Sequence, residues 1–133
     1  MSSLLRPLRV SSVVLLAALL VATMGADVAS ADRFHTRLLT SAPAKDTVLT
    51  LAPTTLALTF SEKVELPTTR IVLLDAAQRS VPLGPVTRTP DVKESPVVAR
   101  ITAPLVPGAY TVQWTVAGAD GHAVKGSFGF TLR

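Results

Sequence analysis

The sequence predicts an all-β protein: an immunoglobulin-like Greek-key β-sandwich of about seven strands, preceded by a cleavable signal peptide. Two observations predict the sandwich. From Leu38 onward the apolar residues recur with a period of two, whereas no segment repeats convincingly with the helical period of about 3.6. Turn signals such as APAKD and VPG separate the short apolar runs at regular intervals, as in two-sheet β-proteins. The signal peptide is predicted from the composition of residues 1–31.

Residues 1–31 contain the three parts of a secretory signal. Arg6 and Arg9 supply positive charge, Val13 to Met24 form an apolar segment, and Ala29-Ser30-Ala31 offers small residues to a signal peptidase. The apolar segment is shorter than the roughly 20 residues of a membrane-spanning helix. We therefore expect an exported, periplasmic or otherwise extracytoplasmic protein, with a mature domain over 32–133 and no membrane span. An uncleaved membrane anchor is the alternative.

Three runs alternate clearly enough to predict strands with one buried face. In TTLALTF the residues at 56, 58 and 60 are apolar, in AYTVQWTV those at 110, 112, 114 and 116, and in SFGFTL those at 128, 130 and 132. Shorter runs at 38–41, 70–74, 81–84 and 97–102 complete the count. Pro82 limits the run at 81–84 to a sheet edge, because proline donates no ladder hydrogen bond. Tyr110 follows the turn residues Pro107-Gly108 and is either a tyrosine corner or an ordinary core residue.

The composition excludes several classes of function. The chain contains no cysteine, so thiolate metal sites and cysteine nucleophiles are excluded, and Met1 and Met24 both lie in the predicted signal. Cleavage after Ala31 lowers the formal net charge from +4 to +3, and the remaining basic residues are scattered rather than clustered. This pattern argues against nucleic-acid binding.

Enzyme signatures are also missing from the sequence. There is no G-x-S-x-G turn, no glycine-rich phosphate loop, and no spacing of carboxylates that suggests acid/base catalysis. We therefore expect no catalytic residues and no enzymatic activity.

The stretch AGADGHAVKG, residues 117–126, allows two interpretations. Asp-Gly between apolar runs is a strong signal for a β-hairpin turn. Asp120 and His122 are also two residues apart, so one metal ion could bind both side chains. The other histidine of the mature domain, His35, precedes the first strand, and Glu62 closes the strand that ends in LTFSE. First and last strands can be neighbours in immunoglobulin-like sandwiches, so His35, Glu62, Asp120 and His122 could meet at one end. These nitrogen and oxygen ligands suit Cu(II), Ni(II) or Zn(II), and the lack of sulfur argues against Cu(I).

Two long segments of the mature domain resemble the CopC family of exported copper-resistance proteins. The first is HTRLLTSAPAKDTVLTLAPTTLALTFSE, which contains the histidine, Ser-x-Pro-Ala and Leu-x-Phe-Ser-Glu of the family opening. The second is LVPGAYTVQWTVAGADGHAVKGSFGF, with Pro-Gly-x-Tyr-x-Val-x-Trp followed by Asp-x-His. The match runs from His35 to Arg133, nearly the whole mature domain.

The resemblance implies a role for each candidate residue. His35 matches the N-terminal histidine ligand of the family, Asp120 and His122 match its Asp-x-His pair, and Glu62 matches a glutamate near the copper site. The implied function is to hold Cu(II) for copper homeostasis and resistance, with delivery to a CopD-like membrane importer. The Asp-Gly loop would then be both a turn and part of a copper site.

One departure from the family pattern leaves another function open. In the family the histidine is the first mature residue, so its amine and imidazole bind copper together. Here cleavage after Ala31 leaves Asp32-Arg33-Phe34 ahead of His35, and the amine is lost as a ligand unless trimming continues. The alternative function is therefore a metal-free immunoglobulin-like interaction module. A copper oxygenase with an N-terminal histidine brace is a third class, which oxygen consumption would distinguish.

Overall fold

The computed structural model describes residues 36–88 and 95–133, which form two β-sheets. The predicted signal peptide and His35 lie outside the described residues. The elements are β1 (Leu38–Ala42), β2 (Val48–Leu49), β3 (Thr55–Phe60), η2 (a 3₁₀ turn, Leu66–Thr68), β4 (Arg70–Leu74), β5 (Ser80–Val81), β6 (Leu83–Arg88), β7 (Val97–Ile101), β8 (Gly108–Ala117) and β9 (Ala123–Leu132).

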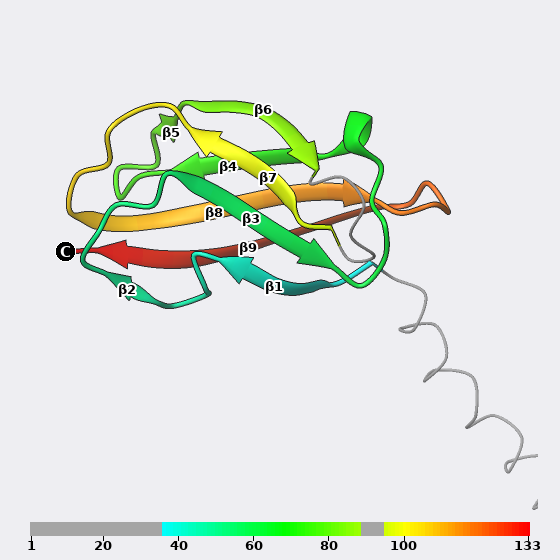
Figure 1. Cartoon of the computed structure of the whole chain (residues 1–133), viewed down its shortest axis with the longest axis horizontal. Helices are drawn as coiled ribbons and strands as arrows, with labels where there is room; N and C mark the ends of the chain where they lie inside the picture. The colour runs from blue at the N-terminus through cyan, green and yellow to red at the C-terminus, as the bar shows by residue number, and fades with distance from the viewer. Residues whose placement is uncertain (1–35, 89–94) are drawn as a thin grey trace, which may run out of the picture. The chain divides into compact units, whose positions relative to one another are not determined.

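The strands form a four-stranded sheet in the order β1-β3-β7-β6 and a five-stranded sheet in the order β2-β9-β8-β4-β5. Figure 1 shows the two sheets stacked as layers, which confirms the predicted all-β sandwich. Seven strands have five or more residues, as expected, and the two-residue strands β2 and β5 extend the sheet edges. In the described residues no helix is long and apolar enough to cross a membrane.

The core lies between the sheets and is built by the alternating residues that the sequence indicates. Every apolar position predicted to face inward on β3, β8 and β9 is buried: Leu56, Leu58, Phe60, Tyr110, Val112, Trp114, Val116, Phe128, Phe130 and Leu132. Burying each such side chain contributes about 1.5–3 kcal/mol. The rings of Phe60 and Trp114 meet across the layers edge to face, with centroids 5.2 Å apart. These two sheets can therefore hold a defined geometry without disulfides.

Tyr110 forms a tyrosine corner at the start of β8. Its hydroxyl donates to the Val106 carbonyl at 2.7 Å and accepts from the Val106 N–H at 3.0 Å. The ring also stacks on Phe130 at 5.3 Å. Of the two interpretations of Tyr110, the corner is therefore the one that the structure supports.

The run at 81–84 contributes to two strands rather than one. Pro82 separates β5, at one edge of the five-stranded sheet, from β6, at one edge of the four-stranded sheet. The edge placement was predicted, but the extension of β6 to Arg88 was not, because Pro85 interrupts the apolar pattern. Pairing of β6 with β7 shifts register between Leu83 and Val86, which accommodates Pro85 inside an edge strand.

Candidate metal centre

The pairing of β1 with β3 places Thr36 beside Glu62. Leu38 pairs with Phe60, and the next residues outward continue this register. The Arg37 N–H donates to Ser61 Oγ at 2.9 Å, and the Ser61 N–H donates to the Arg37 carbonyl at 2.8 Å. One step further out, the Thr36 hydroxyl donates to Glu62 Oε1. The antiparallel register thus fixes which residue of the N-terminal segment meets Glu62.

Gly118 forms the other side of this contact. It is buried and directly follows β8. A Cβ atom added to Gly118 would overlap the Glu62 carboxylate and would lie 2.8 Å from Thr36 Oγ1. The Glu62 carboxylate therefore lies against the backbone at the base of the loop that joins β8 to β9. The Glu65 N–H strengthens this junction by donating to the Ala117 carbonyl at 2.9 Å.

Residues 118–122 form the loop between β8 and β9, with Ala117 paired to Ala123. The Gly121 N–H donates to the Gly118 carbonyl at 3.0 Å, which closes a β-turn around Asp120. Gly121 has φ +77°, a conformation that glycine adopts without strain. The predicted Asp-Gly turn is therefore present, although its loop is longer than the tightest two-residue hairpin.

Asp120 holds His122 through both of its carboxylate oxygens. Oδ1 accepts the His122 N–H at 3.1 Å, and Oδ2 lies 3.1 Å from His122 Nδ1. In the tautomer with the proton on Nδ1, the ring donates to Asp120 and its Nε2 lone pair is available to a metal. The His122 side chain is 79% exposed, so an ion from solvent can reach it.

The three segments that carry the predicted ligands meet at one end of the sandwich. Figure 1 shows the start of β1, the chain after β3 and the β8–β9 loop at the same end, opposite the C-terminus. Within residues 36–88 and 95–133, however, no three His, Cys, Asp or Glu side chains are close enough together to hold a metal. Asp120 and His122 are paired, whereas Glu62 contacts Thr36 and Gly118. His35, one peptide bond from Thr36, lies outside the described part.

The route by which these segments meet differs from the expected one. The sequence allowed the first and last strands to be neighbours, but β1 pairs with β3, and β2 is the strand that pairs with the outer edge of β9. The N-terminal segment instead reaches the β8–β9 loop through Glu62. Sequence reasoning missed Thr36 and Gly118, because neither residue type is a metal ligand and their contact with Glu62 depends on the register.

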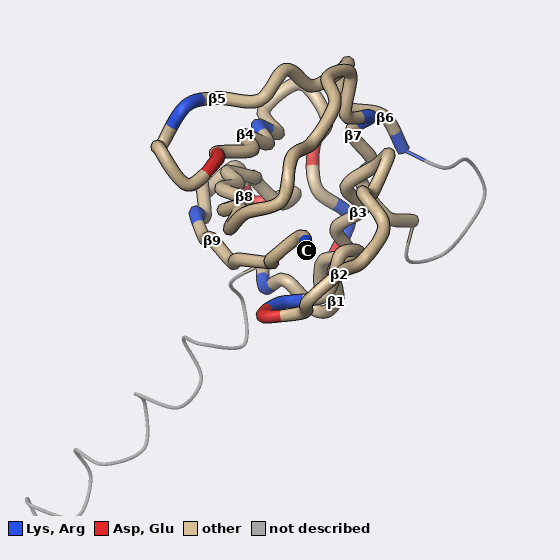
Figure 2. Tube along the Cα trace, turned by 90° about the vertical axis from the view of Figure 1, so that its left-hand side faces the viewer, with Lys and Arg blue, Asp and Glu red and all other residues tan. Residues whose placement is uncertain are grey.

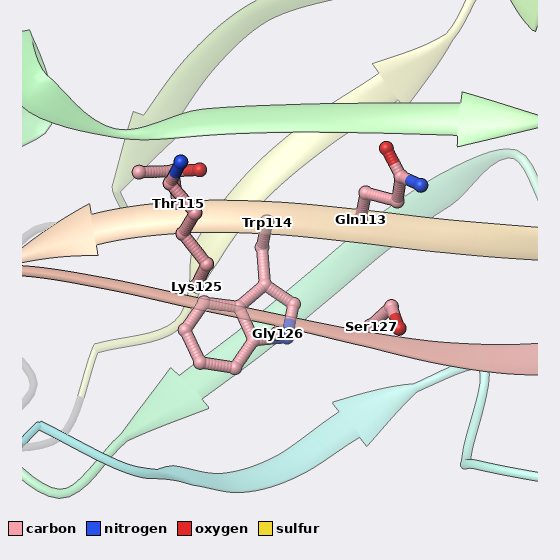
Figure 3. Close-up of a pocket in the computed structure, with 6 residues that line it drawn as sticks. All are labelled: Gln113, Trp114, Thr115, Lys125, Gly126 and Ser127. Atoms are coloured by element: carbon pink, nitrogen blue, oxygen red, sulfur yellow. The ribbon is translucent and has the colours of Figure 1, made fainter.

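Two other surface features lie outside the candidate metal centre. Lys and Arg are spread around the described chain rather than gathered on one side, as Figure 2 shows. A shallow hollow on β8 and β9 is lined by Gln113, Trp114, Thr115, Lys125, Gly126 and Ser127 (Figure 3). This lining offers no carboxylate or imidazole, so the hollow is not part of the candidate metal centre.

Comparison with known proteins identifies relatives with the same architecture. The CopC domain family matches residues 38–133. Copper resistance protein C of Xanthomonas campestris pv. juglandis is 30% identical over 121 residues, covering 85% of this chain and 92% of that protein. Protein YobA of Escherichia coli K12 is 29% identical over 99 residues, covering 74% of this chain and 79% of that protein.

Solved structures give the same result. The crystal structure of CopC from Methylosinus trichosporium OB3b superposes with a TM-score of 0.63 at 26% identity, covering 74% of this chain and 93% of that one. PcoC of Escherichia coli, described as a methionine-rich copper resistance protein, has a TM-score of 0.61 at 25% identity. Its alignment covers 74% of this chain and 99% of PcoC.

Proposed function

This chain belongs to the CopC family, and from that premise we propose that it holds Cu(II). The family matches residues 38–133, and the copper-resistance relatives support a role in copper resistance. In this proposal the protein is an exported, non-catalytic carrier that works outside the cytoplasmic membrane. Its cargo would be one Cu(II) ion, which it passes to a CopD-like membrane importer.

The observation that carries the proposal is the meeting of Thr36, Glu62 and Gly118. This contact brings the segment that follows His35 against the base of the loop that holds Asp120 and His122. We propose His122 Nε2 as the principal ligand, with His35, Glu62 and Asp120 completing the set. Asp120 also orients the imidazole, in the way that carboxylates orient metal-bound histidines in other sites.

The donor types support the divalent ion. PcoC is described as methionine-rich, whereas the only methionines of this chain are Met1 and Met24, both in the predicted signal. A mature domain with imidazole and carboxylate donors and no sulfur suits Cu(II) rather than Cu(I).

The proposal predicts that copper binding depends on the β8–β9 loop. In a titration of the mature protein against a competing Cu(II) chelator, His122→Ala should abolish binding at micromolar protein. Asp120→Asn should weaken it about 10- to 100-fold, since this is the usual cost of losing a group that orients a ligand. Lys125→Ala, an exposed change on the same hairpin, is the control and should bind as the wild type does.

A specific observation supports the alternative function. The described residues contain no group of three metal-binding side chains, so without His35 the site would have too few ligands. A wild-type protein that binds no Cu(II) in this titration would therefore favour the metal-free interaction module.

A further inference from the structure

The geometry points to Thr36 as a positioning residue that, together with Gly118, holds the Glu62 carboxylate where copper can use it. This inference rests on the proposed function, because it concerns the same ion. It assigns roles to two residues that carry no metal-binding group.

Thr36 is one of two buried polar residues in the described part of the chain, with 3% of its surface exposed. Its hydroxyl donates to Glu62 Oε1. Leaving a buried hydroxyl without a hydrogen-bond partner costs about 1–3 kcal/mol of stability, and this cost favours the hydrogen bond between Thr36 and Glu62. One carboxylate oxygen is thus committed to Thr36, and the other remains for a metal. Metal-binding carboxylates in proteins are generally held by such outer hydrogen bonds.

Gly118 provides the space that this arrangement needs. Any side chain at 118 would overlap the Glu62 carboxylate and the Thr36 hydroxyl. Gly118 does not have the positive φ found at Gly121, so alanine is compatible with its backbone. The atoms that must move are the carboxylate at the end of the flexible Glu62 side chain and the Thr36 hydroxyl oxygen. Gly118→Ala should therefore displace the carboxylate while leaving the fold in place.

The arrangement also links two distant segments. Thr36 extends from β1, Glu62 follows β3, and Gly118 begins the loop that carries Asp120 and His122. Fixing Glu62 between Thr36 and Gly118 therefore sets its position relative to the base of the loop that carries His122. Glu62 is exposed overall and has no other hydrogen-bond donor assigned to its carboxylate in the described structure, so Thr36 is the residue that restrains it.

The test compares Cu(II) affinity and the Cu(II) electron paramagnetic resonance spectrum of the mature protein with those of Thr36→Val, Thr36→Ser and Gly118→Ala. Thr36→Val keeps the shape but removes the donor, and we expect affinity to fall about 10- to 100-fold with a changed spectrum. Thr36→Ser keeps a hydroxyl and should restore both. Gly118→Ala should resemble Thr36→Val. In a Glu62→Ala background, Thr36→Val should have no further effect.

Two controls match these changes. Thr69→Val removes the other buried threonine hydroxyl, which bonds to the Glu65 carbonyl at 2.8 Å, and should lower stability without changing copper affinity. Gly84→Ala adds a Cβ that meets its nearest atom at an ordinary 3.6 Å.

Two different failures can be distinguished. If the wild type binds no Cu(II), the proposed function is wrong, and the inference falls with it. If the wild type binds Cu(II) but Thr36→Val and Gly118→Ala match it in affinity and spectrum, only the positioning role is overturned.

Discussion

At the scale of single residues, the contact of Asp120 with His122 orients the side chain that we propose as the principal copper ligand. The same carboxylate bonds the backbone and lies against the ring of His122, so the imidazole is oriented before an ion arrives. Orientation in advance reduces the conformational entropy that binding would otherwise cost. A loop that is exposed and yet internally hydrogen-bonded suits the proposed carrier, which must also release its ion.

The candidate ligands could be proposed from the sequence, but their supporting residues could not. Asp120 and His122 stand out because histidine is rare in this chain and the two residues lie only two positions apart in the loop. Thr36 and Glu62 are 26 residues apart. Their hydrogen bond depends on the register in which Leu38 of β1 pairs with Phe60 of β3, rather than with a residue next to Phe60. A slip of one residue would direct these side chains to opposite faces, and the amino-acid pattern alone does not fix the register at a strand end.

A second residue-scale consequence concerns Gly126, which pairs with Trp114 across β8 and β9. The indole lies over Gly126, as Figure 3 shows, and a Cβ at 126 would come within 3.0 Å of several ring atoms. Because Trp114 is buried and packed on Phe60, the ring has little room to move. Gly126→Ala should therefore destabilise the domain by about 1–3 kcal/mol, the usual cost of overpacking a core.

Urea denaturation of the metal-free protein checks this value. Ser127→Ala, an exposed change at the next position of β9, should leave the free energy of unfolding within about 0.5 kcal/mol of the wild type. Equal stability of Gly126→Ala and wild type would mean that the indole does not occupy this position.

At the scale of elements, proline and the hairpin turns decide where strands begin and end. The long alternating strands β3, β8 and β9 were predictable because one face of each packs in the core. The strands β2 and β5 have two residues each, which is too short for periodicity to show. β2 depends on pairing with the sequence-distant β9, a tertiary effect that local sequence does not encode, whereas β5 pairs with β4 across a short hairpin.

The hairpin between β4 and β5 depends on Asp75. Its Oδ1 accepts the N–H groups of Ala77 and Arg79, each at 2.9 Å, and its Oδ2 accepts Arg79 Nε at 2.9 Å. The backbone N–H of Arg79 lowers the pKa of Asp75 below its ordinary 3.8, and the Arg79 side chain lowers it further. A lowered folded-state pKa means that the ionised carboxylate stabilises the fold above about pH 4, and that this contribution is lost as the pH falls through the lowered pKa.

Asp75→Asn should accordingly be less stable than wild type at pH 7, and the difference should shrink at acid pH. The measurement is the free energy of unfolding of both proteins from pH 7 down to pH 2. Arg79→Ala serves as a comparison, because it keeps the backbone donor and should retain most of the pH dependence. A difference between Asp75→Asn and wild type that stays constant over this range would contradict the assignment.

At the scale of the whole domain, the sandwich holds three sequence-distant segments together at one end. The architecture was predictable because alternation and turns specify two sheets with a shared core. The meeting of the N-terminal segment with the β8–β9 loop was only partly predictable. Its location at one end was expected, whereas the route through β3 and Glu62 follows from a strand order that periodicity does not determine.

The central claim is that this end of the domain holds one Cu(II) ion. Native mass spectrometry of the exported protein, with and without one equivalent of Cu(II), tests it most directly because the same spectrum gives the mature N-terminus and the bound metal. The account predicts a single bound copper in the wild type and none in His122→Ala. An exported protein that begins at Asp32 and carries no copper at micromolar concentration would contradict the claim, and would indicate that this sandwich has another function.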